Sequence, residues 1–179
     1  MRLFIAALLP EEIRKQLTNY IDSLKHNIEG VKWEKSEKLH VTLKFLGDVE
    51  ESMLDDIANL IQERASEYSP FSFNLTELGG FPNLKKKPRI LYIGLSNNTQ
   101  LAKLAYELEE QLAGLGFEKE NRKFVPHITL GRVKKKINIE DRPRIVQSSF
   151  QINQIGLIKS ELRPSGSVYT PVKIVELKK

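Results

Sequence analysis

The sequence contains no cysteine and only three histidines among its 179 residues. The absence of cysteine excludes disulfide scaffolds, thiolate metal sites and cysteine nucleophiles. No apolar run approaches the ~20 residues that a membrane-spanning helix needs. The apolar stretch at residues 3–9 lacks the basic lead and the small-residue cleavage site of a signal peptide. We therefore expect a cytoplasmic protein with no membrane partner.

The sequence also lacks a G-x-x-x-x-G-K-[ST] phosphate-binding loop, so ATP-driven ligation has no visible machinery. No two histidines have the short spacing of a zinc site, and we expect neither a metal nor another cofactor. The composition, 40% hydrophobic and 28% charged, is that of an ordinary globular protein. The net charge of +5 favours polyanionic partners, although many basic proteins bind no nucleic acid.

Helical and strand-like patterns alternate along the chain. Apolar residues recur at helical spacing in three segments, at 11–27, 53–68 and 99–115. Strand-like segments lie at 3–9, 31–34, 39–46, 71–78, 89–95 and 124–133. We also expect a break at 79–82, a short helix at 139–147 despite Pro143, and a closing hairpin made of 149–162 and 167–177. No long linker divides the chain, so we predict one α+β domain over residues 1–179. It should have two antiparallel-rich sheets with helices packed outside.

Two segments of the sequence resemble each other. Residues 40–46 read H-V-T-L-K-F-L, and residues 127–133 read H-I-T-L-G-R-V. In both, a histidine is followed by an aliphatic residue, a threonine and a leucine inside a strand-like run. The copies lie about half the chain apart, which predicts an internal duplication.

Alternate residues of a strand face the same side, so His40 shares a face with Thr42, and His127 with Thr129. If the two halves are related by a pseudo-two-fold axis, these four side chains converge on one cleft. A single H-x-T in a strand is usually structural, but two copies holding two of three histidines indicate a catalytic pair. The third histidine, His26, falls off the apolar stripe of its helix and should be exposed.

This set of side chains suits phosphodiester chemistry. An in-line displacement at phosphorus needs a base for the attacking water and an acid for the departing oxygen, on opposite sides of phosphorus. Imidazole titrates near neutrality, so one histidine can be neutral while the other is protonated. Threonine hydroxyls can donate to the non-bridging oxygens, where negative charge builds up. The residues alone leave open which histidine is the acid and which is the base.

With these motifs, the chain resembles the 2H phosphoesterase superfamily and, within it, the RNA 2′,3′-cyclic phosphodiesterases historically called 2′-5′ RNA ligases. The resemblance covers essentially the whole chain. It rests on the paired H-x-T-x motifs and on flanking stretches at 9–10, 31–33, 79–82, 88–92 and 126–132. It implies a bilobal fold of two pseudo-symmetric lobes around a central cleft. The implied reaction is metal-independent hydrolysis of an RNA 2′,3′-cyclic phosphate end to the 2′-phosphate.

The resemblance also implies a role for each motif residue. On the family pattern, His40 donates a proton to the leaving 3′ oxygen and His127 accepts the proton of water. The threonines at positions 42 and 129 bind the phosphate.

Phe45 and Arg132 occupy the same offset from their histidines. In similar enzymes an aromatic residue and an arginine at this offset help to hold the base and the phosphate. Strict alternation puts both residues on the face opposite the histidines, so they reach the substrate only if the strand bulges or ends before them. The alternative for Phe45 is plain packing in the core.

Two lysine runs, at 85–87 and 134–136, are either solvated loops or tracks for RNA. The expected partner is RNA with 2′,3′-cyclic phosphate ends, with tRNA fragments among the candidates. A monomer is adequate for a cleft formed within one chain. A 2′-5′ RNA ligase and a 2′,5′-oligonucleotide phosphodiesterase need the same two histidines, so both remain alternatives, as does a non-catalytic RNA-binding module.

Overall fold

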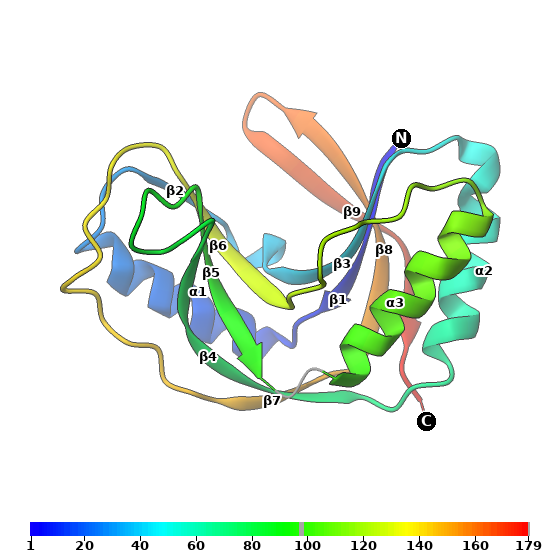
Figure 1. Cartoon of the computed structure of the whole chain (residues 1–179), viewed down its shortest axis with the longest axis horizontal. Helices are drawn as coiled ribbons and strands as arrows, with labels where there is room; N and C mark the ends of the chain where they lie inside the picture. Colours follow the sequence, from blue (N-terminus) through cyan, green and yellow to red (C-terminus); the bar gives the residue numbers. More distant parts are fainter. Residues whose placement is uncertain (97–98, 179) are drawn as a thin grey trace.

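The computed structural model describes residues 1–96 and 99–178 (Figure 1). The helices in these residues are α1 (Glu11–Lys25), α2 (Leu54–Ala65) and α3 (Thr99–Gly114), with short 3-10 helices η1 (Ser36–Lys38) and η2 (Glu51–Met53). The strands are β1 (Arg2–Leu8), β2 (Val31–Trp33), β3 (His40–Asp48), β4 (Phe71–Phe81), β5 (Ile90–Ser96), β6 (His127–Val133), β7 (Ser149–Ile152), β8 (Gln154–Arg163) and β9 (Gly166–Glu176). The α+β class is confirmed.

The strands form two antiparallel sheets, and each sheet draws on both halves of the sequence. The first sheet has the order β3-β1-β8-β9, and the second has the order β2-β6-β5-β4-β7. The N-terminal strands β1 and β3 therefore share a sheet with the C-terminal hairpin β8–β9, whereas β2 pairs with β6. As the chain leaves β2 for the first sheet, Glu34 N donates to Leu130 O at 2.7 Å. The two lobes are interleaved in sequence.

The helices cover the sheets with the apolar faces that their spacing predicts. Figure 1 shows α1 on the side of β4, β5 and β6, and α2 with α3 on the side of β1, β3 and β8. The buried face of α1 consists of Ile13, Leu17, Tyr20, Ile21 and Leu24. His26 follows this helix and is exposed, as expected. Among the described residues, no helix is long and apolar enough to cross a membrane.

Strand β1 is buried on both faces, which explains its unbroken apolar sequence. Leu3, Ile5 and Ala7 join the main core, while Phe4 and Ala6 pack with Ile158 in a smaller cluster on the opposite face. The second face of β1 is the one on which the first motif lies.

The structure corrects two expected strand limits. Strand β4 continues through Gly79 and Gly80 to Phe81, because both glycines stay paired with β5. The segment 149–162 is two strands, since the chain changes sheet at Asn153: β7 pairs with β4, and β8 pairs with β1.

The short helix expected at 139–147 is also wrong, because that segment has no regular structure. Its carbonyl groups are satisfied by side chains of α1 and of the turn that follows it. Tyr20 Oη donates to Pro143 O at 2.9 Å, Gln16 Nε2 to Val146 O at 2.8 Å, and Asn27 Nδ2 to Asp141 O at 3.2 Å. The segment therefore lies along α1, and Pro143 has no helical turn to break.

Candidate active site

Each motif strand contains one extra residue at the same offset. In β3 this residue is Leu43, which has no partner on β1, and in β6 it is Leu130, which has no partner on β5; nearer the end of β3, Leu46 also lacks a partner on β1. Leu43 and Leu130 each lie three residues after the motif histidine. Such a bulge shifts the alternation of side chains by one position. The two copies thus share a backbone irregularity as well as a sequence.

The bulges bring Phe45 and Arg132 to the faces of the histidines. On β1, His40 lies opposite Leu8 and Phe45 opposite Phe4, which are on the same side of that unbroken strand. On β5, His127 lies opposite Gly94 and Arg132 opposite Ile90, again on one side. The bulge that this placement requires is therefore present in both motif strands. Phe45 is 71% exposed, so the alternative of core packing is wrong.

His40 is held in one orientation by contacts to both ring nitrogens. Its Nδ1 lies 2.6 Å from Lys38 O, and its Nε2 lies 2.8 Å from Thr42 Oγ1. A carbonyl oxygen only accepts, so Nδ1 carries the hydrogen and Nε2 of the neutral ring accepts from the Thr42 hydroxyl. The rings of Phe4 and Tyr169 flank the imidazole at centroid distances of 4.9 and 5.7 Å.

His127 has a matching environment in the second sheet. Its Nδ1 lies 2.7 Å from Val125 O, which again assigns the hydrogen to Nδ1 and leaves Nε2 to react. Phe81 and Tyr92 flank the ring at centroid distances of 5.0 and 5.3 Å. A Cβ at Gly79 would overlap the ring of Tyr92, so the position of this ring requires glycine at residue 79.

Burial favours the neutral form of both histidines, because it lowers the pKa of each. Burial lowers the pKa of His40; the Lys38 carbonyl raises it and the charge of His127 lowers it further. Burial likewise lowers the pKa of His127, opposed by the Val125 carbonyl. A contribution of His127 to the lowered pKa of His40 is what a shared cleft predicts. This is consistent with the close approach of β3 and β6.

The remaining motif residues lie where the strand pattern predicts. Thr42 and Thr129 are half-buried on the faces of their histidines. Arg132 is exposed, and its charge and that of Arg2 both lower the pKa of Tyr169, which burial raises. These two cations therefore lie near the ring that flanks His40.

The sequence interpretation missed the aromatic side chains around both histidines: Phe4, Tyr169, Phe81 and Tyr92. Phe4 and Tyr92 lie on the strands that pair with β3 and β6, whereas Tyr169 and Phe81 lie on strands further along each sheet, so all four come together with the histidines only through the sheet order. Phe81 and Tyr92 belong to stretches that carry the family resemblance, which is the one signal that pointed to them.

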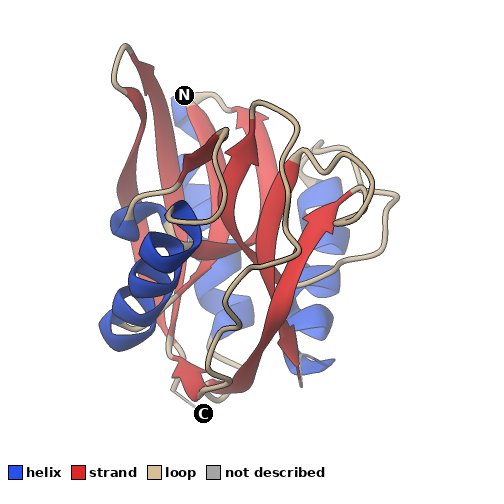
Figure 2. Cartoon of the chain, turned by 90° about the vertical axis from the view of Figure 1, so that its left-hand side faces the viewer, coloured by secondary structure: helices blue, strands red, loops and turns tan. Residues whose placement is uncertain are grey.

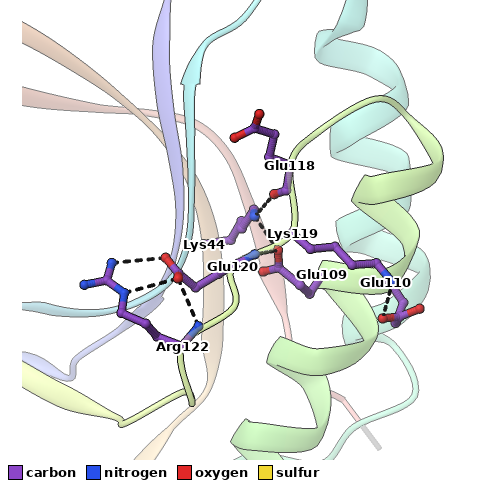
Figure 3. Close-up of polar contacts among 7 residues, drawn as sticks. All are labelled: Lys44, Glu109, Glu110, Glu118, Lys119, Glu120 and Arg122. Atoms are coloured by element: carbon purple, nitrogen blue, oxygen red, sulfur yellow. Dashed lines mark hydrogen bonds and ion pairs between the residues drawn. The ribbon is translucent and has the colours of Figure 1, made fainter.

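An ion pair behind the site joins the first motif strand to α3. The side chain of Lys44 is buried and contacts the Glu109 carboxylate, and its Nζ also donates to Glu118 O at 2.5 Å (Figure 3). The same Glu109 oxygen accepts from Glu120 N at 2.6 Å. Lys44, which follows the β3 bulge, thus links β3 to the loop that leads toward the second motif.

The fold and the site define a class: a two-histidine phosphoesterase with one H-x-T motif on each of two sheets. The family model described as LigT like Phosphoesterase matches the chain twice, over residues 8–92 and 93–169. The chain belongs to this family. The two matches divide the sequence in agreement with the duplication that the motifs predict.

Relatives match over almost the full chain. A Methanocaldococcus jannaschii protein named RNA 2′,3′-cyclic phosphodiesterase is 38% identical, over 97% of this chain and 99% of its own length. A Thermotoga maritima protein of the same name is 37% identical, over 94% and 91%. A Thermus thermophilus crystal structure superposes with a TM-score of 0.88 at 31% identity, over 99% and 98%. The E. coli LigT complex with 3′-AMP superposes with a TM-score of 0.81 at 30% identity, over 99% and 98%.

Proposed function

We propose that this chain hydrolyses a 2′,3′-cyclic phosphate at an RNA end to a 2′-phosphate, with His40 and His127 as the acid/base pair and without a metal. The observation that carries the proposal is the matched pair of imidazoles, each with Nδ1 on a carbonyl oxygen two residues earlier. The full-length relatives named RNA 2′,3′-cyclic phosphodiesterase support the substrate class.

The reaction is a single in-line displacement. His127 Nε2 removes a proton from water, and the oxygen of that water forms a bond to phosphorus. The bond from phosphorus to the 3′ oxygen breaks, and His40 Nε2 gives its proton to that oxygen. The product is a 2′-phosphomonoester with a free 3′ hydroxyl. At the end His40 is neutral and His127 is protonated, so one proton must return through solvent before the next turnover.

Four other side chains hold the substrate in this proposal. The hydroxyls of Thr42 and Thr129 donate to the non-bridging oxygens, where charge builds up in the transition state. Arg132 pairs with the phosphate. Phe45 offers an exposed aromatic face to the terminal base.

The organisation and the setting of the protein are part of the same proposal. Residues 1–179 act as one domain of two pseudo-symmetric lobes, the protein works as a monomer, and its location is the cytoplasm. RNA with cyclic phosphate ends, including tRNA fragments, is the partner.

Product analysis tests the proposal. A short RNA ending in a 2′,3′-cyclic phosphate is incubated with the protein and EDTA, and the phosphorus NMR spectrum is followed. The expected product is the 2′-phosphate alone. A 3′-phosphate, or a requirement for added metal, would contradict the mechanism. Joining of a second RNA through a 2′-5′ linkage in place of hydrolysis would move the assignment to the ligase.

A further inference from the structure

Two lysines from different elements meet at the turn of the β8–β9 hairpin. This hairpin extends beyond the rest of its sheet (Figure 1 and Figure 2). A methyl group built on Gly166 would lie 3.7 Å from Lys38 Nζ and 3.8 Å from Lys32 Nζ. Gly166 has φ +113°, a conformation that L side chains rarely adopt, so the turn presents backbone to these ammonium groups. Lys32 comes from β2 and Lys38 from η1.

The two positive charges are not neutralised by the protein. Within residues 1–96 and 99–178, neither lysine has a carboxylate within ion-pair distance. The nearby acidic side chain is Glu34, whose charge raises the pKa of Tyr169. Two ammonium groups that approach one point repel each other, and an anion between them converts that repulsion into attraction.

The lysine pair is connected to the catalytic residues on both sides. Lys38 Nζ lies 5.7 Å from the centroid of Tyr169, and that ring lies 5.7 Å from the ring of His40. Lys32 lies directly opposite Arg132 where β2 pairs with β6. The ring of Tyr169 therefore lies between Lys38 and His40. Lys32 is on the strand next to that of Arg132. The lysines therefore lie beside the proposed site of the reacting phosphate and do not belong to that site.

We propose that Lys32, Lys38 and the turn at Gly166 bind the phosphodiester on the 5′ side of the terminal nucleotide. The site then recognises an RNA chain end and discriminates against a free cyclic mononucleotide, which lacks that phosphate. Lysine suits this contact because it binds phosphate as a point charge and needs no fixed geometry, which fits a flexible RNA chain. This inference rests on the proposed hydrolysis, since it assigns a second subsite to the same substrate.

The test compares two dinucleotide substrates that both end in a 2′,3′-cyclic phosphate. One has an ordinary phosphodiester between its nucleosides, and the other has an uncharged methylphosphonate at that position. The quantity measured is the ratio of their kcat/KM values on one enzyme preparation, so that the folded fraction cancels. The enzymes are wild type, the Lys32→Gln/Lys38→Gln double variant, and Lys35→Gln, an exposed lysine between the other two in sequence.

We expect wild type and Lys35→Gln to prefer the charged linkage by about tenfold, because each ammonium near a phosphate in solvent contributes roughly threefold to fivefold. The double variant should lose that preference. Its slope of log kcat/KM against log salt for the charged substrate should become shallower by about 0.7, the value for one phosphate on a single strand.

Three different results would contradict the proposal, and the experiment distinguishes them. Equal ratios in wild type and the double variant, with both substrates hydrolysed, would overturn the second subsite and leave the proposed function intact. If Lys35→Gln also lost the preference for the charged linkage, the preference would come from general surface charge. That result would overturn the assignment to Lys32 and Lys38. No hydrolysis of either substrate by wild type would overturn the proposed function and this inference with it.

Discussion

At the scale of single residues, each catalytic imidazole is held by a carbonyl oxygen two residues earlier, at 2.6 Å for His40 and 2.7 Å for His127. This contact fixes the tautomer and directs Nε2 toward the substrate. The aromatic rings around each histidine exclude water, and this burial lowers both pKa values. His40, the proposed acid, therefore holds a proton at neutral pH less readily than an ordinary histidine does.

The pH dependence of the reaction follows from these shifts. The proposed mechanism needs His40 protonated and His127 neutral, so it predicts that activity falls both above and below a maximum. Because both pKa values are lowered, the maximum of kcat/KM should lie below about pH 6.5, the pKa of an unperturbed histidine side chain. Initial rates across a pH series measure it, with the exposed-residue variant His26→Ala as the control. A maximum above about pH 8 would contradict the roles assigned to the pair.

Arg132 provides a second prediction at this scale. Replacement by alanine should raise KM by about tenfold, since one charge-assisted hydrogen bond to phosphate is lost. Arg132→Lys should recover part of the loss, because it keeps the charge without the planar fork. Steady-state kinetics on the cyclic-phosphate RNA measure both, beside Arg144→Ala, an exposed arginine in the segment along α1. Unchanged KM and kcat in Arg132→Ala would remove this residue from the site.

The sequence predicted the motif residues because a period of two fixes which side chains share a face. It did not predict the rings that surround them. Tyr169 reaches His40 from a strand three positions away in the first sheet, through a pairing that joins the two ends of the chain. No local pattern records such a neighbour.

At the scale of elements, the bulges in β3 and β6 decide which residues line the site. Strict alternation would have left Phe45 and Arg132 on the wrong face, and the extra residues Leu43 and Leu130 correct this. A bulge has no dependable sequence mark, so the faces of these strands beyond the bulge could not be predicted. The helices α1, α2 and α3 were predictable because their apolar faces are long and regular, whereas the short segment 139–147 has no such face and is not a helix.

The ion pair of Lys44 gives a prediction about stability. Lys44→Met leaves the Glu109 carboxylate, whose side chain is only 15% exposed, without its cation, which should lower the free energy of unfolding by about 3 kcal/mol. Urea unfolding followed by far-UV circular dichroism measures the change. The matched control is Lys119→Met, which breaks an exposed pair with Glu110 on the same helix and should leave the midpoint almost unchanged. Equal midpoints for Lys44→Met and wild type would show that this pair contributes nothing to stability.

At the scale of the whole molecule, the two lobes do not coincide with the halves of the sequence. Strand β2 completes the second sheet, and the C-terminal hairpin completes the first. The duplication was predictable from the two motifs, and the family match at residues 8–92 and 93–169 confirms it. The interleaving was not, because strand order across two sheets depends on contacts between distant segments.

The basic surface gives a prediction at this scale. The run 134–136 is exposed and follows β6 directly, beside the start of β2, where Lys134 N donates to Gly30 O at 2.7 Å. Changing all three lysines to glutamine should weaken oligonucleotide binding and flatten its salt dependence, because fewer counterions are released. Binding of a cyclic mononucleotide should change little. Fluorescence anisotropy at several salt concentrations measures this, and an equal loss for both ligands would refute a role in tracking RNA.

The most direct test of the two-histidine mechanism is a kinetic cycle on an RNA with a 2′,3′-cyclic phosphate end, with wild type, His40→Ala, His127→Ala and the double variant. If the histidines act as one unit, each single variant should lose about 10²–10⁴ in kcat. The double variant should lose little more than either single one. A single variant that turns over at the wild-type rate would contradict the acid/base pair.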